Sequence, residues 1–306
     1  MQNIKNPLVT VLMTTYNNEN ALLRTINSVL WQNFGNFELL ILNDASTDNT
    51  ENVIEKILDK RVKKLNFKKN RGQLWRLNTG KKIAQGKYIA FIDNGDIWFP
   101  EFLENMVEAT KDGTRYAYCW CSGQIRKPFL SIDNTYADWL YQGVLADTAT
   151  LFCESSLAKE TKFINNGEGF LSDDLFTLNV AKKEKVKLVP KDLCIKLETT
   201  YDGIPHNSAN FKLTASCAID YFLTIKEDIY KHCGFIGLSR HNYLICLKLL
   251  QGFQIILFTK HLFLATCYYL LQYRTNKKYT RKINIASIIK SFTKNMLIGI
   301  NYVTKR

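Results

Sequence analysis

The sequence predicts an α/β fold built on a mostly parallel sheet. Short apolar runs rich in β-branched residues alternate with stretches in which apolar residues recur at helical spacing. The runs are typical of buried strands and the periodic stretches of helices, so their alternation indicates βαβ units. Polar residues also directly follow three of the runs, as in sheets that bind ligands at the carboxyl ends of their strands.

The individual elements follow from these patterns. Apolar runs predict strands at 8–13, 37–42, 62–67, 88–92, 115–121, 186–190 and 194–199. Helical spacing predicts helices over 22–30, over 53–58 after the capping residues Ser46 to Asp48, over 74–84, and from Ser172 onward. Residues 128–170 are expected to be rich in loops, and the pattern from about 213 to the end is helical.

Charge divides the chain into two predicted parts. Residues 1–212 carry 27 Lys and Arg against 25 Asp and Glu, whereas residues 213–306 carry 14 against 3. We therefore expect a domain over 1–212 and a basic helical tail over 213–306. An apolar, cationic tail favours peripheral contact with an anionic membrane; a helical subdomain or a dimer interface is the alternative. Nucleic-acid binding is not expected, because no binding motif or basic–aromatic ribbon accompanies the charge.

Cysteine usage and apolar segments indicate the compartment. None of the eight cysteines forms a CxxC pair, and Cys119 and Cys121 would share one face of a strand, where a disulfide is geometrically poor. These features predict reduced, mostly buried thiols in a cytosolic protein. The N-terminus MQNIKNP lacks the apolar region of a signal peptide, and the most apolar part of the tail is interrupted by Lys260 and His261. Neither a signal peptide nor a transmembrane helix is expected.

Two blocks of sequence carry a resemblance to a known family. The first reads TTYNNENALLRTINSVLWQNFGNFELLILNDASTDNT and the second reads NRGQLWRLNTGKKIAQGKYIAFIDNGD. They resemble the family 2 glycosyltransferases, strongly over about residues 6–100 and more weakly over 145–210. The resemblance implies the Rossmann-like GT-A fold of nucleotide-diphospho-sugar transferases, an inverting mechanism and a divalent metal. It also implies a nucleotide-sugar donor, usually a uridine diphosphate sugar.

The resemblance further implies which residues bind the donor. Asp44 occupies the position whose carboxylate accepts a hydrogen bond from the nucleobase; a helix cap or turn acid is the alternative. Arg76-Leu77 replaces the Ala-Arg that usually precedes the asparagine, so Arg71 and Arg76 are both candidates for the phosphate-facing arginine. The full predicted donor-binding set is Thr14, Tyr16, Asn17, Asp44, Arg71, Arg76, Asn78 and Asp93.

The metal-binding motif departs from the family pattern. Asp93-Asn94-Gly95-Asp96 has a glycine where the main metal-ligating carboxylate normally lies. A hard divalent cation with oxygen ligands neutralises the charge that develops on a leaving diphosphate. We therefore expect Mn²⁺ or Mg²⁺ on Asp93 and Asp96, with waters completing the shell and His206 as a further ligand. Two alternatives stay open: basic side chains replace the metal, or the protein binds donor weakly and catalyses poorly.

A second acid pair, Asp173 and Asp174, lies where helical periodicity begins after Ser172. Acids in a first helical turn are favoured by the helix dipole alone. The resemblance, however, places a Glu–Asp pair here whose second acid is the general base. Asp174 is therefore expected to deprotonate the acceptor hydroxyl as it attacks the anomeric carbon, with inversion and without a covalent intermediate.

The resemblance, carried by these residues, implies an inverting glycosyltransferase of the hexosyltransferase type. Its product would be a bacterial capsule, lipopolysaccharide or other surface polysaccharide, and its acceptor a glycan or lipid-linked glycan at the inner face of the membrane. One alternative is a GT-A domain that binds a sugar nucleotide or a partner protein but barely catalyses, because of Gly95. A nucleotidyltransferase is the other, but TTYNNEN is not the glycine-rich phosphate loop that it would need.

Overall fold

A computed structural model describes residues 6–122, 133–134, 136–137, 140, 147–164, 172–196, 222–223, 225–233, 238 and 264–265. The strands are β1 (Val9–Thr15), β2 (Phe37–Asn43), β3 (Val62–Asn66), β4 (Tyr88–Asp93), β5 (Ile97–Trp98), β6 (Tyr116–Ser122), β7 (Asp133–Asn134), β8 (Leu151–Glu154) and β9 (Val186–Ile195). The helices are α1 (Glu19–Leu30), α2 (Thr50–Glu55), α3 (Gln73–Ile83), α4 (Phe102–Ala109), α6 (Ser155–Glu160) and α7 (Ser172–Ala181), with a 3₁₀ turn η1 at Thr148–Thr150.

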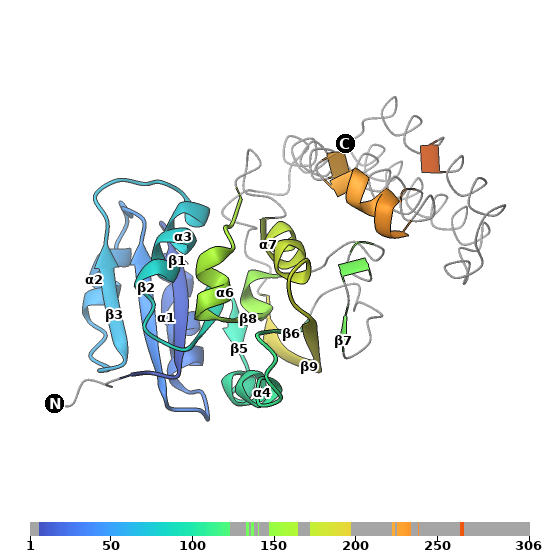
Figure 1. Cartoon of the computed structure of the whole chain (residues 1–306). Coiled ribbons are helices and arrows are strands. Elements are labelled where there is room, and N and C mark those ends of the chain that lie inside the picture. The colour runs from blue at the N-terminus through green and yellow to red at the C-terminus, as the bar shows by residue number, and fades with distance from the viewer. Residues whose placement is uncertain are drawn as a thin grey trace, which may run out of the picture. The chain divides into compact units, whose positions relative to one another are not determined.

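All nine of these strands belong to one sheet (Figure 1). Its order is β3-β2-β1-β4-β8-β6-β9-β5, and β7 pairs with β9. The pairs β3–β2, β2–β1 and β1–β4 are parallel, which confirms the predicted α/β sheet over its first half. Beyond β4 the pairing is mixed, because β8 runs antiparallel to both of its neighbours.

Each face of the central strands has its own layer of helices. Val11 and Met13 of β1 belong to a core cluster that includes apolar residues of α1, α2 and α4. On the other face α3 packs against β1 and β2, and α6 packs against β4, β8 and α3. All seven residues of both β1 and β2 are buried, because two helical layers cover them. This explains why these strands read as nearly continuous apolar runs, with Glu38 as the charged exception.

Several sequence-based expectations need correction. In place of the two strands predicted at 186–190 and 194–199, the structure has one ten-residue strand, β9, over Val186–Ile195. The register of β9 against β6 shifts near Trp120. Strand β8 and helix α6 lie within residues that were expected to be loops, and β5 and α4 were not predicted. The helix predicted over 53–58 is α2, which ends at Glu55. Its N-cap is Asn49, with no side-chain capping bond, rather than a residue of Ser46 to Asp48.

The thiol prediction is confirmed for the described cysteines. Cys119, Cys121, Cys153, Cys194 and Cys233 are buried and free of disulfides.

The chain forms two compact units. The first comprises 1–136, 144–165 and 172–199 and contains all the strands named above; the second comprises 137–143, 166–171 and 200–306. Residues 225–233 of the second unit are helical. Most of the basic tail lies outside the described residues. Among the residues that are described, no helix has the length and apolarity needed to cross a bilayer.

Gly86, between α3 and β4, lies against the backbone of β1 at Val9 and Thr10. A Cβ at this position would lie 2.6 Å from the carbonyl carbon of Val9 and 2.8 Å from the carbonyl oxygen of Tyr88. We expect Gly86→Ala to lower the free energy of unfolding by about 1–3 kcal/mol or more, because backbone atoms of paired strands cannot move aside. Urea unfolding measures the change. Gly35→Ala is the matched control, since nothing lies within 4 Å of its Cβ; equal midpoints for the two variants would contradict the prediction.

Candidate functional site

The candidate site lies at the carboxyl ends of β1 and β4. Strand order reverses here, because β1 continues toward β2 and β3 on one side and toward β4 on the other. Such a switch point leaves a crevice outside the strand ends, where open α/β sheets bind ligands. Thr14 pairs with Asp93 in the β1–β4 register. The polar residues after β1 and the acids after β4 are therefore neighbours, as the sequence predicted.

A tight turn after β4 presents two of the acids. The backbone N–H of Asp96 donates to the carbonyl of Asp93 at 3.1 Å. Between them Gly95 has a φ of +118°, a conformation that L-residues rarely adopt, and its N–H donates to Thr25 Oγ1 of α1 at 2.9 Å. The backbone of this turn therefore favours glycine for a conformational reason. A carboxylate at position 95 would require a strained or rearranged turn.

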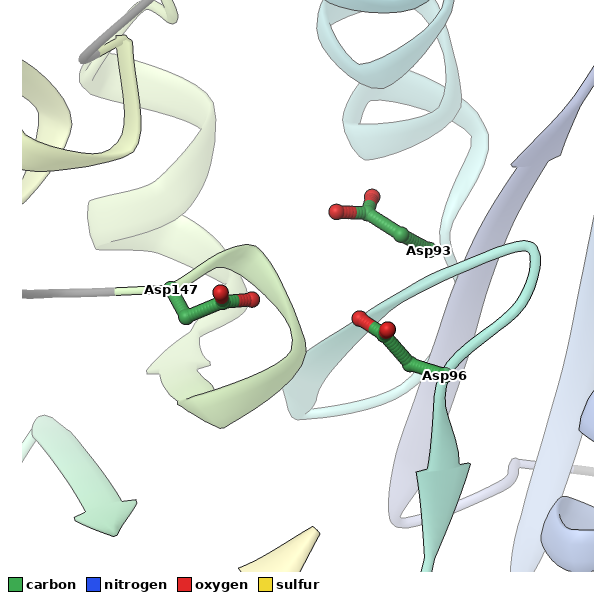
Figure 2. Close-up of side chains that lie close together, drawn as sticks. All are labelled: Asp93, Asp96 and Asp147. Carbon is green, nitrogen blue, oxygen red and sulfur yellow. The ribbon is translucent and has the colours of Figure 1, made fainter. Parts of the chain in front are cut away.

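A third acid, Asp147, joins this pair from a different element (Figure 2). One carboxylate oxygen from each of Asp93, Asp96 and Asp147 lies within 4.8 Å of the others. Asp147 immediately precedes η1, where its side chain accepts from the N–H of Ala149 at 3.2 Å. Asp96 and Asp147 are buried and Asp93 is partly exposed, so the group is open on the Asp93 side. We call these three residues the acid cluster.

Two polar side chains orient the acid cluster. Gln73, the first residue of α3, donates from Nε2 to Asp93 Oδ1 at 2.6 Å. Lys196, directly after β9, donates from Nζ to Asp147 Oδ2 at 2.7 Å. Strand pairing brings Lys196 to the cluster, because Ile195 lies opposite Ile97, the residue after Asp96. These bonds, with the one from the Ala149 N–H, fix how the Asp93 and Asp147 carboxylates are oriented in the cluster.

The acid pair of α7 lies near the same charges. Burial raises the pKa of Asp173 to about 6; the Asp147 carboxylate adds to the rise, and Lys196 opposes it. Asp173 Oδ1 accepts from the N–H of Asp174 at 3.0 Å, and Asp174 itself is buried. A carboxyl group whose pKa lies near neutrality is suited to proton transfer at physiological pH.

Asp44, at the end of β2, organises the loop before α3. Its carboxylate accepts from the N–H of Arg71 at 3.0 Å and from the N–H of Gly72 at 2.7 Å. It also pairs with Nε of Arg76, a buried guanidinium that lies over the ring of Phe67. The Arg71 N–H also lies 3.1 Å from the second oxygen, so each carboxylate oxygen accepts two of these contacts. Asp44 thus acts as a turn acid in this structure.

Some of the other predicted donor-binding residues are exposed, and others make hydrogen bonds within the protein. Tyr16 is 47% exposed and Arg71 is exposed, with its guanidinium over the ring of Trp75. Asn17 bonds to Ser46 and Thr47, so it joins the loops after β1 and β2.

Four predicted residues remain. Arg76 and Thr14 are buried. Asn78 exchanges two hydrogen bonds with the backbone of Phe163, on the same side of the sheet as α6. His206, the predicted additional metal ligand, lies outside the described residues.

Sequence reasoning missed Gln73, Asp147 and Lys196. Asp147 has one local signal, the Asp-Thr-Ala-Thr pattern in which Asp147 and Thr150 cap each other. That pattern predicts a helix start and carries no information about a site. Gln73 and Lys196 reach the acid cluster through strand pairing and helix placement, for which the sequence holds no local signal.

The acid cluster fits a divalent metal. All three side chains offer carboxylate oxygens, which are the donors that Mg²⁺ and Mn²⁺ prefer. Two of the three are buried, and ionised carboxylates this close together repel unless a cation lies among them. Lys196 supplies one positive charge against the three carboxylates. The donor set and the remaining negative charge are thus consistent with one divalent ion.

Comparisons with known proteins agree with this geometry. The model of the family described as "Glycosyl transferase family 2" matches residues 10–149. An uncharacterized glycosyltransferase of Haemophilus influenzae is 33% identical over 168 residues, which cover 52% of this chain and 67% of that protein. The Escherichia coli UDP-Glc:alpha-D-GlcNAc-diphosphoundecaprenol beta-1,3-glucosyltransferases WfgD and WfaP are 39% and 35% identical over 33% and 45% of this chain. This chain spans 40% and 51% of the length of those two proteins.

Solved structures show the same fold. Mannosyltransferase PcManGT from Pyrobaculum calidifontis, in complex with GDP-Man and Mn²⁺, superposes with a TM-score of 0.62 at 14% identity, over 98% of this chain and 84% of its own. S. aureus TarS 1-349, in complex with UDP-GlcNAc, gives a TM-score of 0.58 at 16% identity, over 86% and 91%. These neighbours are GT-A glycosyltransferases, so the predicted GT-A fold is confirmed. The sequence matches and the fold together show that this chain belongs to the family 2 glycosyltransferases.

Proposed function

We propose that this protein is an inverting glycosyltransferase that moves a sugar from a uridine diphosphate donor to a hydroxyl group of a growing surface glycan. The observation that carries the proposal is the convergence of the acid cluster with the acid pair of α7 at the β1–β4 switch point. A diphosphate needs a cation beside it and an acceptor hydroxyl needs a base. This crevice has groups suited to both needs.

The donor is proposed to lie across the ends of β1, β2 and β4. Tyr16 has an exposed ring that can cover a uracil base, and the Asp44 carboxylate is the proposed acceptor for its imide N–H. Arg71 is the exposed candidate for a phosphate contact, whereas Arg76 is occupied by Asp44. The names of WfgD and WfaP specify UDP-Glc, and TarS was solved with UDP-GlcNAc, which supports a uridine donor here.

Asp93, Asp96 and Asp147 are the proposed holders of Mn²⁺ or Mg²⁺. When bound, such an ion would supply positive charge to the diphosphate as the sugar–phosphate bond breaks. Asp147 then provides the carboxylate that Gly95 lacks, from an element about 50 residues later in the chain. Mn²⁺ is present in the complexes of PcManGT and of Mycobacterium tuberculosis glucosyl-3-phosphoglycerate synthase, which supports a metal in this fold.

The acceptor is proposed to be a lipid-linked glycan. WfgD and WfaP are named for transfer to GlcNAc-diphosphoundecaprenol, and TuaG of Bacillus subtilis is named as a putative teichuronic acid biosynthesis glycosyltransferase. The 14 basic residues against 3 acidic ones in residues 213–306 fit peripheral contact with an anionic leaflet, where such an acceptor resides. We accordingly place the protein at the inner face of the membrane, with no nucleic acid as a partner.

Removal of the Asp147 carboxylate tests the metal site. We expect Asp147→Asn to weaken Mn²⁺ binding by at least roughly 10- to 100-fold, because one of three anionic ligands is lost. Asparagine keeps an oxygen for the capping bond to Ala149, so the fold should be retained. Calorimetric Mn²⁺ titration in the presence of UDP measures the change. Asp112→Asn, at an exposed aspartate away from the cluster, is the control; equal Mn²⁺ affinity in both variants would remove Asp147 from the site.

The general base is tested by comparing the two acids of α7. We expect Asp174→Asn to lower turnover by roughly 10²–10⁴-fold with UDP affinity unchanged, because only proton removal from the acceptor is lost. Release of UDP with a lipid-linked acceptor is the readout. Wild-type turnover in this variant, with the loss appearing in Asp173→Asn instead, would move the role to Asp173.

The pH profile gives an independent check on Asp173. Its pKa of about 6 means that it is ionised at pH 7.5 and takes up a proton as the pH falls through 6. If ionised Asp173 supports transfer, kcat/KM of the wild type falls below about pH 6, and Asp173→Asn removes that acid limb. An unchanged limb in Asp173→Asn would assign the titration to another group.

A further inference from the structure

Helix α3 contacts both halves of the candidate site. Its first residue, Gln73, donates to Asp93 of the acid cluster. One turn and two turns further on, Asn78 and Lys81 reach the segment Thr161–Phe163, which follows α6 and precedes α7 in the chain. The helix therefore links the metal-binding side of the proposed site to the segment before its base.

Asn78 and Lys81 hold the backbone of this segment from one side. Asn78 Nδ2 donates to the carbonyl of Phe163 at 2.8 Å, and the N–H of Phe163 donates back to Asn78 Oδ1 at 3.0 Å. Lys81 Nζ donates to the carbonyl of Thr161. The side-chain amide thus satisfies both backbone groups of one residue, much as a neighbouring strand would.

Aromatic packing connects Phe163 to α7, which has the proposed base, and to β4, which ends at Asp93. Phe163 stacks on Phe176 of α7, with centroids 4.3 Å apart and ring planes 9° from parallel. Phe91 of β4 meets both rings edge-on, at 5.4 and 6.0 Å. Phe176 lies two residues after Asp174, and Phe91 lies two residues before Asp93. A displacement of Phe163 would therefore shift the proposed base relative to the acid cluster.

A buried lysine between α3 and these aromatic rings is unfavourable if its only role is packing. The side chain of Lys81 is 2% exposed, and its ammonium lies 5.0 and 5.2 Å from the ring centroids of Phe163 and Phe176. Desolvation of a buried ammonium is unfavourable, and here it lowers the pKa of Lys81 to about 8. An apolar side chain of similar length would avoid this cost. What the lysine adds is a directed bond to one carbonyl and a cation over two ring faces.

We propose that Asn78 and Lys81 are positioning residues that hold α7, through Phe163 and Phe176, at the distance from the acid cluster that transfer requires. This inference rests on the proposed function, and it replaces the donor-binding role that the family resemblance implied for Asn78. Neither residue needs to touch the donor or the acceptor. Their effect is on the alignment of attacking hydroxyl and donor, where misplacement by about 1 Å can cost on the order of 100-fold in rate.

Three variants of the full chain test the proposal. Lys81→Met keeps the side-chain length and removes the bond, Asn78→Leu removes both bonds, and Asn78→Asp keeps the acceptor for the Phe163 N–H. We expect Lys81→Met and Asn78→Leu to lower kcat by roughly 10- to 100-fold with UDP affinity within twofold of wild type, and Asn78→Asp to lie between. Ile54→Ala is the control, because it opens a cavity in α2 on the opposite face of the sheet.

Hydrogen exchange supplies a readout that does not depend on activity. The amides of α7 should exchange at least about tenfold faster in Lys81→Met than in Ile54→Ala, at temperatures where both are folded. Unchanged exchange in α7, or weaker UDP binding by Asn78→Asp with kcat unchanged, would overturn the proposal. If the wild type transfers no sugar, the proposed function fails, whereas the exchange comparison still decides whether these residues hold α7.

Discussion

The turn between β4 and β5 is the constraint on which the site depends. It reverses the chain within four residues, so that Asp93 and Asp96 present carboxylates to one space, and Gly95 adopts a φ of +118° to close it. The hydrogen bond from Gly95 to Thr25 fixes the turn to α1, and the side chain of Asn94 bonds to Thr15 at the end of β1. The parallel pairing of β1 with β4 thus sets where the acids lie.

The same turn sets the electrostatics of the crevice. Immediately after it, β5 pairs with β9 and so brings Lys196 beside Asp147. Burial raises the pKa of Asp173 on α7, and Asp147 adds to that rise. The acids of three separate elements are therefore coupled by charge, and a cation that enters the acid cluster would act on all of them. In this arrangement the loss of a carboxylate at position 95 does not leave the site without a third acid.

Much of the fold was predictable from sequence because the central strands are buried on both faces. β1, β2 and β4 therefore appear as nearly continuous apolar runs, and Asp93, Asp96 and Asp44 lie at or just after their ends. The short strands β5 and β8 have two and four residues, too few for a periodic pattern. The exposed Pro190 and Lys191 interrupt the apolar pattern of β9 at the point where its register shifts. Because of this interruption, the sequence predicts two strands where the structure has one.

The site was predictable only where its residues adjoin the motif strands. Asp147, Gln73 and Lys196 reach it through contacts between residues roughly 20 to 55 positions apart, which leave no local trace in the sequence. Asn78 and Arg76 show the converse case. Their motif positions suggested ligand contacts, and the structure places Asn78 against Phe163 and Arg76 against Asp44.

A crystal structure of the protein with UDP and Mn²⁺, with anomalous differences recorded for manganese, tests the central claim most directly. We predict one anomalous peak bonded to carboxylate oxygens of Asp93, Asp96 and Asp147 and to the diphosphate, with the uracil beside Tyr16 and Asp44. A manganese peak away from these three carboxylates, or UDP bound away from the ends of β1 and β4, would contradict it.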